Sequence, residues 1–176
     1  MDDVTTKAPP RPLPTYDAPM TWADVLAHPA LQDLPFKIEL NEHGQILMSP
    51  TSNRHSRVQR RVMRLLEDRL GGEALPECNV DTTDGVKVAD IGWAEAAFFD
   101  ARDHEDAYIV APPICVEVES PSNTEAEMQE KVALYLAKRA QEVWLCDLNG
   151  RVRFFGPEGQ REASQVAPDF PAQLEG

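Results

Sequence analysis

The chain has 176 residues, 42% of them hydrophobic, and a formal net charge of -13. This length suits one domain with a substantial core, and the charge argues against non-specific coating of nucleic acid, because lysine and arginine carry phosphate binding. No apolar run reaches the roughly 18 residues of a membrane span, and MDDVTTKAPP lacks the features of a signal peptide, so we expect a cytoplasmic protein without membrane contact.

The first predicted elements are a tail, a short helix and a hairpin. Residues 1–20 contain five prolines and few large apolar groups, so they bury too little surface to offset ordering entropy and predict a flexible tail. Thr21, followed three positions later by Asp24, predicts a helix cap. Alternating apolar and polar residues in FKIELNEHGQILMS predict a β-hairpin near residues 36–48, with Glu39 on its first strand.

A basic helix is predicted next, ending at Gly71-Gly72. Residues 54–69, RHSRVQRRVMRLLEDR, hold six arginines against two acids in an otherwise acidic chain. The helix has an apolar face with arginines beside it. These arginines are candidate contacts for nucleic acid, although a solvated helix face would show the same pattern; the stripe consists of Arg57, Arg60, Arg61 and Arg64.

Further β-prone runs near residues 74–80, 85–91 and 94–100 predict three strands, and ICVEV predicts another near 113–119. Capping residues after it predict a helix near residues 124–140. EVWLCD, an Asn-Gly turn and RVRFFG predict a terminal hairpin.

The element order predicts an α/β fold. A helix crossing between the strands at 113–119 and 142–147 makes these strands parallel neighbours in a mixed sheet, and helices flank the sheet. We therefore expect a single domain over residues 21–160, followed by a C-terminal tail at 161–176.

Four ionisable residues lie on elements that can aim them at one point: Glu39, Asp90, Glu117 and Lys131. Hydrolysis of a phosphodiester requires neutralised charge, a hydroxide-like nucleophile and help for the leaving alkoxide, and a divalent cation supplies all three. Two carboxylates, Asp90 and Glu117, suit Mg²⁺, which prefers oxygen ligands and keeps several waters. Lys131 lies at the edge of its helix's packed face, so its long stem can bring the ammonium near Glu117.

The carboxylates also have structural interpretations. Glu39 fits a solvent-facing strand residue, and Asp90 fits an ordinary turn residue. Glu117 is harder to explain in this way, because an unpaired carboxylate is expensive to bury among apolar neighbours.

Lys131 and His55, on two predicted helices, also have structural interpretations. Lys131 follows Glu127 by four positions, a spacing at which the two side chains can form an ion pair on the helix surface. His55 lies within one turn of Val58, where a core or capping role fits as well as a role in a site.

Four stretches resemble one known family: ELNEHGQILMSPTSNRH, VADIGWA, ICVEVESPSNT and EKVALY. They are similar to the Uma-type restriction-endonuclease-like family, a bacterial branch of the PD-(D/E)xK nuclease superfamily, over roughly residues 20–156. Glu39 stands nine residues before Met48, and Lys131 stands fourteen after Glu117, as the family pattern requires. The resemblance implies a restriction-endonuclease-like core with an N-terminal hairpin and a magnesium or manganese ion. It also implies active-site roles for Glu39, Asp90, Glu117 and Lys131, with Asp90 and Glu117 as metal ligands, and the family often has a histidine at the position of His55.

Two positions depart from the family pattern. Ala89 stands where the superfamily signature has a proline that shapes a turn and ligates nothing. Glu119 stands where an aliphatic residue is usual, and the two-residue period of a strand places it on the face of Glu117. This extra acid would add a metal ligand or support one, or it would repel a phosphate and lower activity.

These observations predict a magnesium-dependent endonuclease that cleaves DNA by in-line attack of an activated water. A catalytically silent nuclease fold that binds nucleic acid or a protein partner fits the same residues, as does a metal-dependent hydrolase of another phosphoester. Convergence of the charged groups favours catalysis, whereas Lys131 paired with Glu127 in solvent favours the silent protein. The resemblance implies a homodimer that cuts two strands, although no residue pattern marks an interface.

Overall fold

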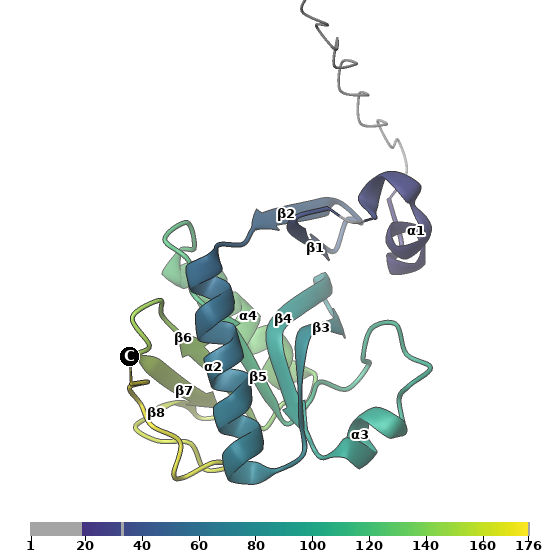
Figure 1. Ribbon diagram of the computed structural model, residues 1–176. Helices are drawn as coiled ribbons and strands as arrows, with labels where there is room; N and C mark the ends of the chain where they lie inside the picture. The colour runs from purple at the N-terminus through teal and green to yellow at the C-terminus, as the bar shows by residue number, and fades with distance from the viewer. Residues whose placement is uncertain (1–18, 33, 176) are drawn as a thin grey trace, which may run out of the picture.

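A mixed six-stranded sheet forms the centre of the protein (Figure 1). The computed structural model describes residues 19–32 and 34–175. In spatial order the strands are β3 (Glu73–Thr82), β4 (Gly85–Ala94), β5 (Ile114–Val118), β6 (Glu142–Cys146), β7 (Val152–Gly156) and β8 (Gly159–Arg161). β5 and β6 are parallel and the other neighbouring pairs are antiparallel, which confirms the predicted α/β fold and its parallel pair.

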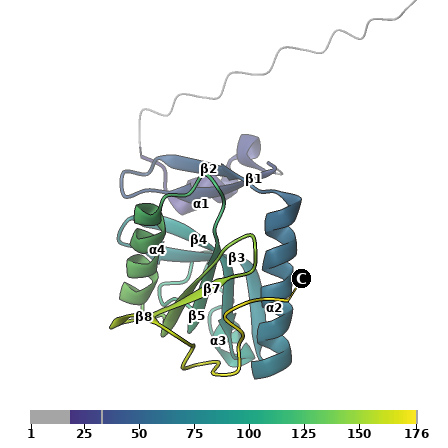
Figure 2. The same ribbon diagram turned by 90° about the vertical axis from the view of Figure 1, so that its left-hand side faces the viewer.

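Two long helices cover opposite faces of this sheet, as Figure 2 shows. α2 (Asn53–Leu70) packs Val62 into a core that contains Trp144. α4 (Glu125–Ala137) packs Val132 into a second core on the other face. The shorter helices are α1 (Trp22–Ala27), η1 (Pro29–Leu31) and α3 (Ala96–Asp100).

The predicted hairpin is a separate two-stranded sheet that lies across one end of the main sheet (Figure 1). β1 (Phe36–Leu40) pairs antiparallel with β2 (Ile46–Pro50). Its contact with β4 is close, because a Cβ atom at Gly85 would lie 2.5 Å from the carbonyl oxygen of Leu40. Glycine at this position, where φ is +75°, lets the hairpin rest on β4.

The structure moves the boundary between the predicted N-terminal tail and the domain. Residues 1–18 lie outside the described residues. Met20 is buried, and its N–H donates to the carbonyl of Gly44 at 3.1 Å. The domain therefore includes Met20, which the prediction assigned to the tail.

The strand expected near residues 94–100 does not form. β4 already extends to Ala94, and Ala96–Asp100 is the short helix α3. Adjacent alanines favour a helix here, and Phe98 packs edge-on against Tyr108, with ring centroids 5.8 Å apart. No helix in the described residues is long and apolar enough to cross a bilayer.

Part of the predicted C-terminal tail, residues 161–176, packs on the sheet, and Arg161 belongs to β8. Phe170 is buried against Trp144, with ring centroids 4.5 Å apart. The N–H of Leu174 donates to the carbonyl of Gly150 at 2.8 Å. Irregularly spaced apolar residues carry no helix or strand period, which is why the sequence pattern misses this packing.

Glu142 holds the C-terminal segment to the sheet. Its carboxylate is fully buried and accepts hydrogen bonds from the Ser164 hydroxyl at 2.6 Å, the Gln165 N–H at 2.6 Å and the Trp144 indole N–H at 2.9 Å. Arg161 supplies the opposite charge at 3.2 Å.

Replacing Glu142 with alanine should lower the free energy of unfolding by about 3–5 kcal/mol, because it leaves buried donors and a charged partner without an acceptor. Urea unfolding of the variant measures this loss. Glu158→Ala, at an exposed position, serves as the control and should change stability by less than about 0.5 kcal/mol. Equal effects of the two substitutions would contradict the anchoring role of Glu142.

Candidate active site

The candidate site lies where regular pairing between β4 and β5 stops. Their register runs from Trp93 opposite Ile114 to Ile91 opposite Val116 and goes no further toward Asp90. Residues two apart in a strand normally share a face, yet Ile91 packs in the core on the α2 side and Ala89 in the core on the α4 side. The backbone of β4 therefore twists around Asp90, and this places its side chain between the two separating strands.

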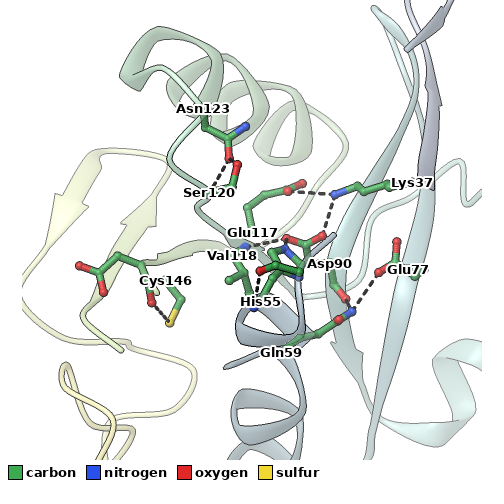
Figure 3. A network of polar contacts seen from close by, with 12 residues as sticks. Lys37, His55, Gln59, Glu77, Asp90, Glu117, Val118, Ser120, Asn123 and Cys146 are labelled. Atoms are coloured by element: carbon green, nitrogen blue, oxygen red, sulfur yellow. Dashed lines mark hydrogen bonds and ion pairs between the residues drawn. The ribbon is translucent and has the colours of Figure 1, made fainter. Parts of the chain in front are cut away.

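Asp90 binds a group from each of three elements, as Figure 3 shows. Its Oδ1 accepts from Lys37 Nζ at 2.7 Å. Its Oδ2 accepts from the Val118 N–H at 2.7 Å and lies 3.1 Å from His55 Nε2. Burial alone would raise the pKa of Asp90, but Lys37 and His55 outweigh it and hold this pKa below its ordinary value.

Glu117 is only 3% exposed and takes part in the same network. Its Oε1 accepts from the Tyr135 hydroxyl at 2.7 Å and from Lys131 Nζ at 3.2 Å. Its Oε2 accepts from Lys37 Nζ at 3.3 Å. Burial raises the pKa of Glu117 in spite of the two neighbouring ammonium groups.

Glu39 reaches the cluster from the hairpin. Its Oε1 accepts from the Val88 N–H and from Lys131 Nζ, both at 2.8 Å. Burial opposes ionisation, but Lys131 and Lys37 outweigh it and lower the pKa of Glu39. The carboxylate thus satisfies a backbone donor on β4 and also holds the lysine of α4.

Lys131 pairs with Glu39 and Glu117, whereas Glu127 caps the start of α4. The Glu127 carboxylate accepts from the Thr124 N–H at 2.8 Å, and the Thr124 hydroxyl accepts from the Glu127 N–H, which makes a capping box at the start of α4. The structure therefore brings Glu39, Asp90, Glu117 and Lys131 together, and Lys131 does not form the surface pair that its spacing also permits.

Two residues of this cluster are missing from the sequence predictions. Lys37 stands two positions before Glu39, a spacing that places both on one strand face. Tyr135 stands four positions after Lys131, a spacing that places both on one helix face. Both spacings can be read from the sequence, but a strand lysine is more often solvated, and a tyrosine on an apolar helix face more often belongs to the core.

α2 supports the site with two side chains one turn apart. His55 Nε2 forms a hydrogen bond with Asp90, and this bond raises the pKa of His55. The His55 side chain is therefore part of the cluster. Its Nδ1 is buried and has no hydrogen-bond partner among the described residues. Gln59 Nε2 donates to the Asp90 carbonyl at 2.6 Å and to Glu77 Oε1 at 3.1 Å. Glu77 has a φ of 51°, a strained backbone for a non-glycine residue, on the strand beside Asp90.

The fold agrees with the comparisons. The model of the Uma2 family, described as "Putative restriction endonuclease", matches residues 22–175. The chain belongs to the Uma2 family. It is similar in fold to a crystal structure described as a "putative nuclease belonging to DUF820" from Anabaena variabilis, with 17% sequence identity and a TM-score of 0.59. That match covers 77% of this chain and 86% of the other. No curated protein matches the chain.

Glu119 lies apart from the cluster in this Uma2 chain. Glu119 follows β5 directly, and its N–H donates to the Cys146 carbonyl of β6 at 2.8 Å. Its carboxylate instead accepts from Arg153 at 2.8 Å. Among the contacts of the described residues, none joins Glu119 to Asp90 or Glu117, which corrects the expectation of a third acid at the site.

The arginine stripe also lies away from the cluster. It lines a groove of about 610 Å³ between α2 and the C-terminal segment, together with Pro171 and Gln173. Among the described contacts, three of the stripe's side chains form no ion pair with an acidic residue. These three are Arg57, Arg60 and Arg61.

The donor set at Asp90 and Glu117 fits a magnesium or manganese ion held by two carboxylates. The described residues contain no group of three or more His, Cys, Asp or Glu side chains placed to hold a metal. However, Asp90 Oδ1 and Glu117 Oε2 both reach one cation, the Lys37 ammonium. Mg²⁺ is commonly bound through one or two carboxylates with water filling the other positions, so two converging oxygens suffice.

The lowered pKa of Asp90 predicts a specific pH dependence of stability. In the unfolded chain this carboxyl titrates near about 3.9, so its stabilising contribution is complete above that pH and is lost as pH falls through the lower folded-state value. Asp90→Asn removes this contribution at every pH. The difference in free energy of unfolding between wild type and Asp90→Asn should therefore shrink below about pH 4, as measured by urea unfolding between neutral and acid pH. A difference that stays constant over this range would contradict the ionised Asp90.

Proposed function

We propose that this Uma2-family chain is a metal-dependent endonuclease that hydrolyses phosphodiester bonds of DNA. The observation that carries the proposal is the convergence of three carboxylates and Lys131 from four separate elements. Lys131 contacts two of these carboxylates and is 15% exposed. A buried ion pair often stabilises a fold no more than well-packed apolar residues would, so a purely structural purpose does not require so many buried charges at one point.

Asp90 and Glu117 would hold the Mg²⁺ or Mn²⁺ ion. When bound, this ion supplies charge neutralisation at the phosphate and a water of lowered pKa. The Val118 N–H and His55 fix the Asp90 carboxylate from one side. The Tyr135 hydroxyl fixes Glu117 in the same way, so neither carboxylate is free to turn away from a shared ligand.

Lys131 would position the attacking water and stabilise the charge that builds on the phosphate. An ammonium has three N–H donors, and the contacts of Lys131 within the described residues direct two of them to Glu39 and Glu117. The third donor is available for water or a phosphate oxygen. Glu39 anchors the ammonium at the site and is held in turn by the Val88 N–H.

The arginine groove beside α2 supports nucleic acid as the substrate class. Phosphate binding depends on lysine and arginine, and this groove gathers positive charge on a chain with a net charge of -13. Arg57 and Arg61 are suited to phosphate contact, because a guanidinium presents a planar fork of donors. A long polyanion such as DNA can reach both the groove and the cluster, whereas a small phosphoester can occupy only one of them.

Variants of the cluster test catalysis. Asp90→Asn, Glu117→Gln and Lys131→Met should each lower cleavage of DNA by roughly 100-fold or more, the size expected when a transition-state interaction is removed. Glu127→Gln is the control, because it lies on the same helix and keeps an acceptor for its cap. The assay measures nicking of supercoiled plasmid and cleavage of single-stranded DNA and RNA with Mg²⁺ or Mn²⁺. If wild type cuts none of these substrates but binds them, the chain is a silent nuclease fold and the proposal fails.

Variants of the groove test the substrate. Arg57→Gln combined with Arg61→Gln should weaken DNA binding and reduce the slope of log K against log salt by about 0.9 for each phosphate that the protein no longer neutralises. Arg102→Gln is the matched control, because Arg102 stacks on Phe98 outside the groove. Fluorescence anisotropy at several salt concentrations gives both quantities. An unchanged slope in the double variant would exclude the groove from DNA binding.

A further inference from the structure

Lys37 occupies the gap between the two carboxylates (Figure 3). Of the four carboxylate oxygens on Asp90 and Glu117, two are held by groups at the sides of the cluster. Asp90 Oδ2 faces the Val118 N–H and His55, and Glu117 Oε1 faces Lys131 and Tyr135.

The remaining two oxygens both contact Lys37 Nζ. The distances are 2.7 Å to Asp90 Oδ1 and 3.3 Å to Glu117 Oε2. These are the oxygens that a cation shared by the two residues would use. Mg²⁺ binds oxygen at about 2.0–2.1 Å and demands near-octahedral geometry, so the ion and the ammonium cannot occupy this gap together.

Lys37 also balances the charge of the cluster when no divalent cation is bound. Three carboxylates are buried there, and a buried carboxylate without a partner is strongly unfavourable. The side chain of Lys37 is 8% exposed, so its ammonium substitutes for water as the partner of both Asp90 and Glu117. The Lys37 side chain thereby provides the positive charge that a bound metal would provide.

We propose that Lys37 is a built-in occupant of the cation position and that its ammonium must leave the gap between Asp90 and Glu117 before a divalent cation binds. This inference rests on the proposed metal-dependent function. The flexible four-carbon stem of a lysine permits such a movement without unfolding of the strand. The backbone of Lys37 lies in the β1–β2 hairpin, which rests on β4 at Gly85, so the displaced ammonium remains tethered beside the site.

Binding of Mn²⁺ to the full chain tests the proposal by isothermal titration calorimetry. Lys37→Met should bind Mn²⁺ at least about tenfold more tightly than wild type, since one opposite charge within about 4–6 Å changes the proton affinity of a carboxylate by 10- to 1000-fold. Lys37→Arg keeps a competing cation and should not gain affinity.

Lys131→Met is the matched control. This substitution also removes one positive charge from Glu117. Lys131, however, contacts Glu117 Oε1 and neither of the two oxygens that Lys37 bridges. A general gain from lost positive charge would appear equally in both methionine variants. Displacement from the gap predicts a clearly larger gain for Lys37→Met.

A measurement on wild type covers the case in which Lys37→Met fails to fold. The side-chain ammonium signals of Lys37 and Lys131, observed by NMR, should respond differently to Mg²⁺. The Lys37 signal should lose its buried, hydrogen-bonded character at saturation, and the Lys131 signal should persist. An unchanged Lys37 signal at saturating Mg²⁺ would overturn the displacement.

The outcomes separate this inference from the proposed function. If wild type binds Mn²⁺ and Lys37→Met binds it no more tightly, Lys37 is a permanent ion-pair partner, the inference fails and the proposed nuclease stands. If Lys37→Met binds Mn²⁺ and wild type does not, the inference is supported. If neither protein binds Mn²⁺, the metal-dependent function is rejected and the inference is rejected with it.

Discussion

Three buried carboxylates at the break between β4 and β5 must be neutralised, and the elements around the site supply the positive charge. Lys37 comes from β1 and Lys131 from α4, while His55 on α2 adds a ring nitrogen 3.1 Å from Asp90. Because burying charge without a partner is so unfavourable, this requirement ties the hairpin and both long helices to one point of the sheet. The charge cluster is therefore as much a feature of the fold as of the chemistry.

The carboxylates also complete the backbone hydrogen bonds of the interrupted sheet. Where β4 and β5 separate, Asp90 accepts from the Val118 N–H, and Glu39 accepts from the Val88 N–H. A buried backbone donor without a partner would destabilise the fold. The separation of the strands creates the site, and the side chains of the site make that separation tolerable.

Much of this arrangement could be predicted from local patterns. The hairpin and the parallel pair follow from period, turn residues and element order, whereas the four charged positions were singled out by the family resemblance. Lys37 could not be recognised, because an alternating strand places a lysine on a solvated face as readily as in a buried cluster. Glu119 was wrongly expected at the site, because its carboxylate pairs with Arg153 of β7 and not with the cluster. The partner that a charged side chain meets on a neighbouring strand depends on tertiary pairing, and a single strand's sequence does not contain that information.

α2 presents one face to the carboxylate cluster and a different face to the arginine groove. His55 and Gln59 face Asp90, whereas Arg57 and Arg61 are offset from them by two positions, about 200° around the helix, and line the groove. A nucleic acid held only in the groove therefore lies on the far side of α2 from the carboxylates. The carboxylates lie near the N-terminal end of α2, at His55, where the chain arrives from β2. The hairpin that carries Lys37 and Glu39 adjoins this end of α2, so the element that contributes the occupying ammonium also borders the side of the cluster nearest the start of α2.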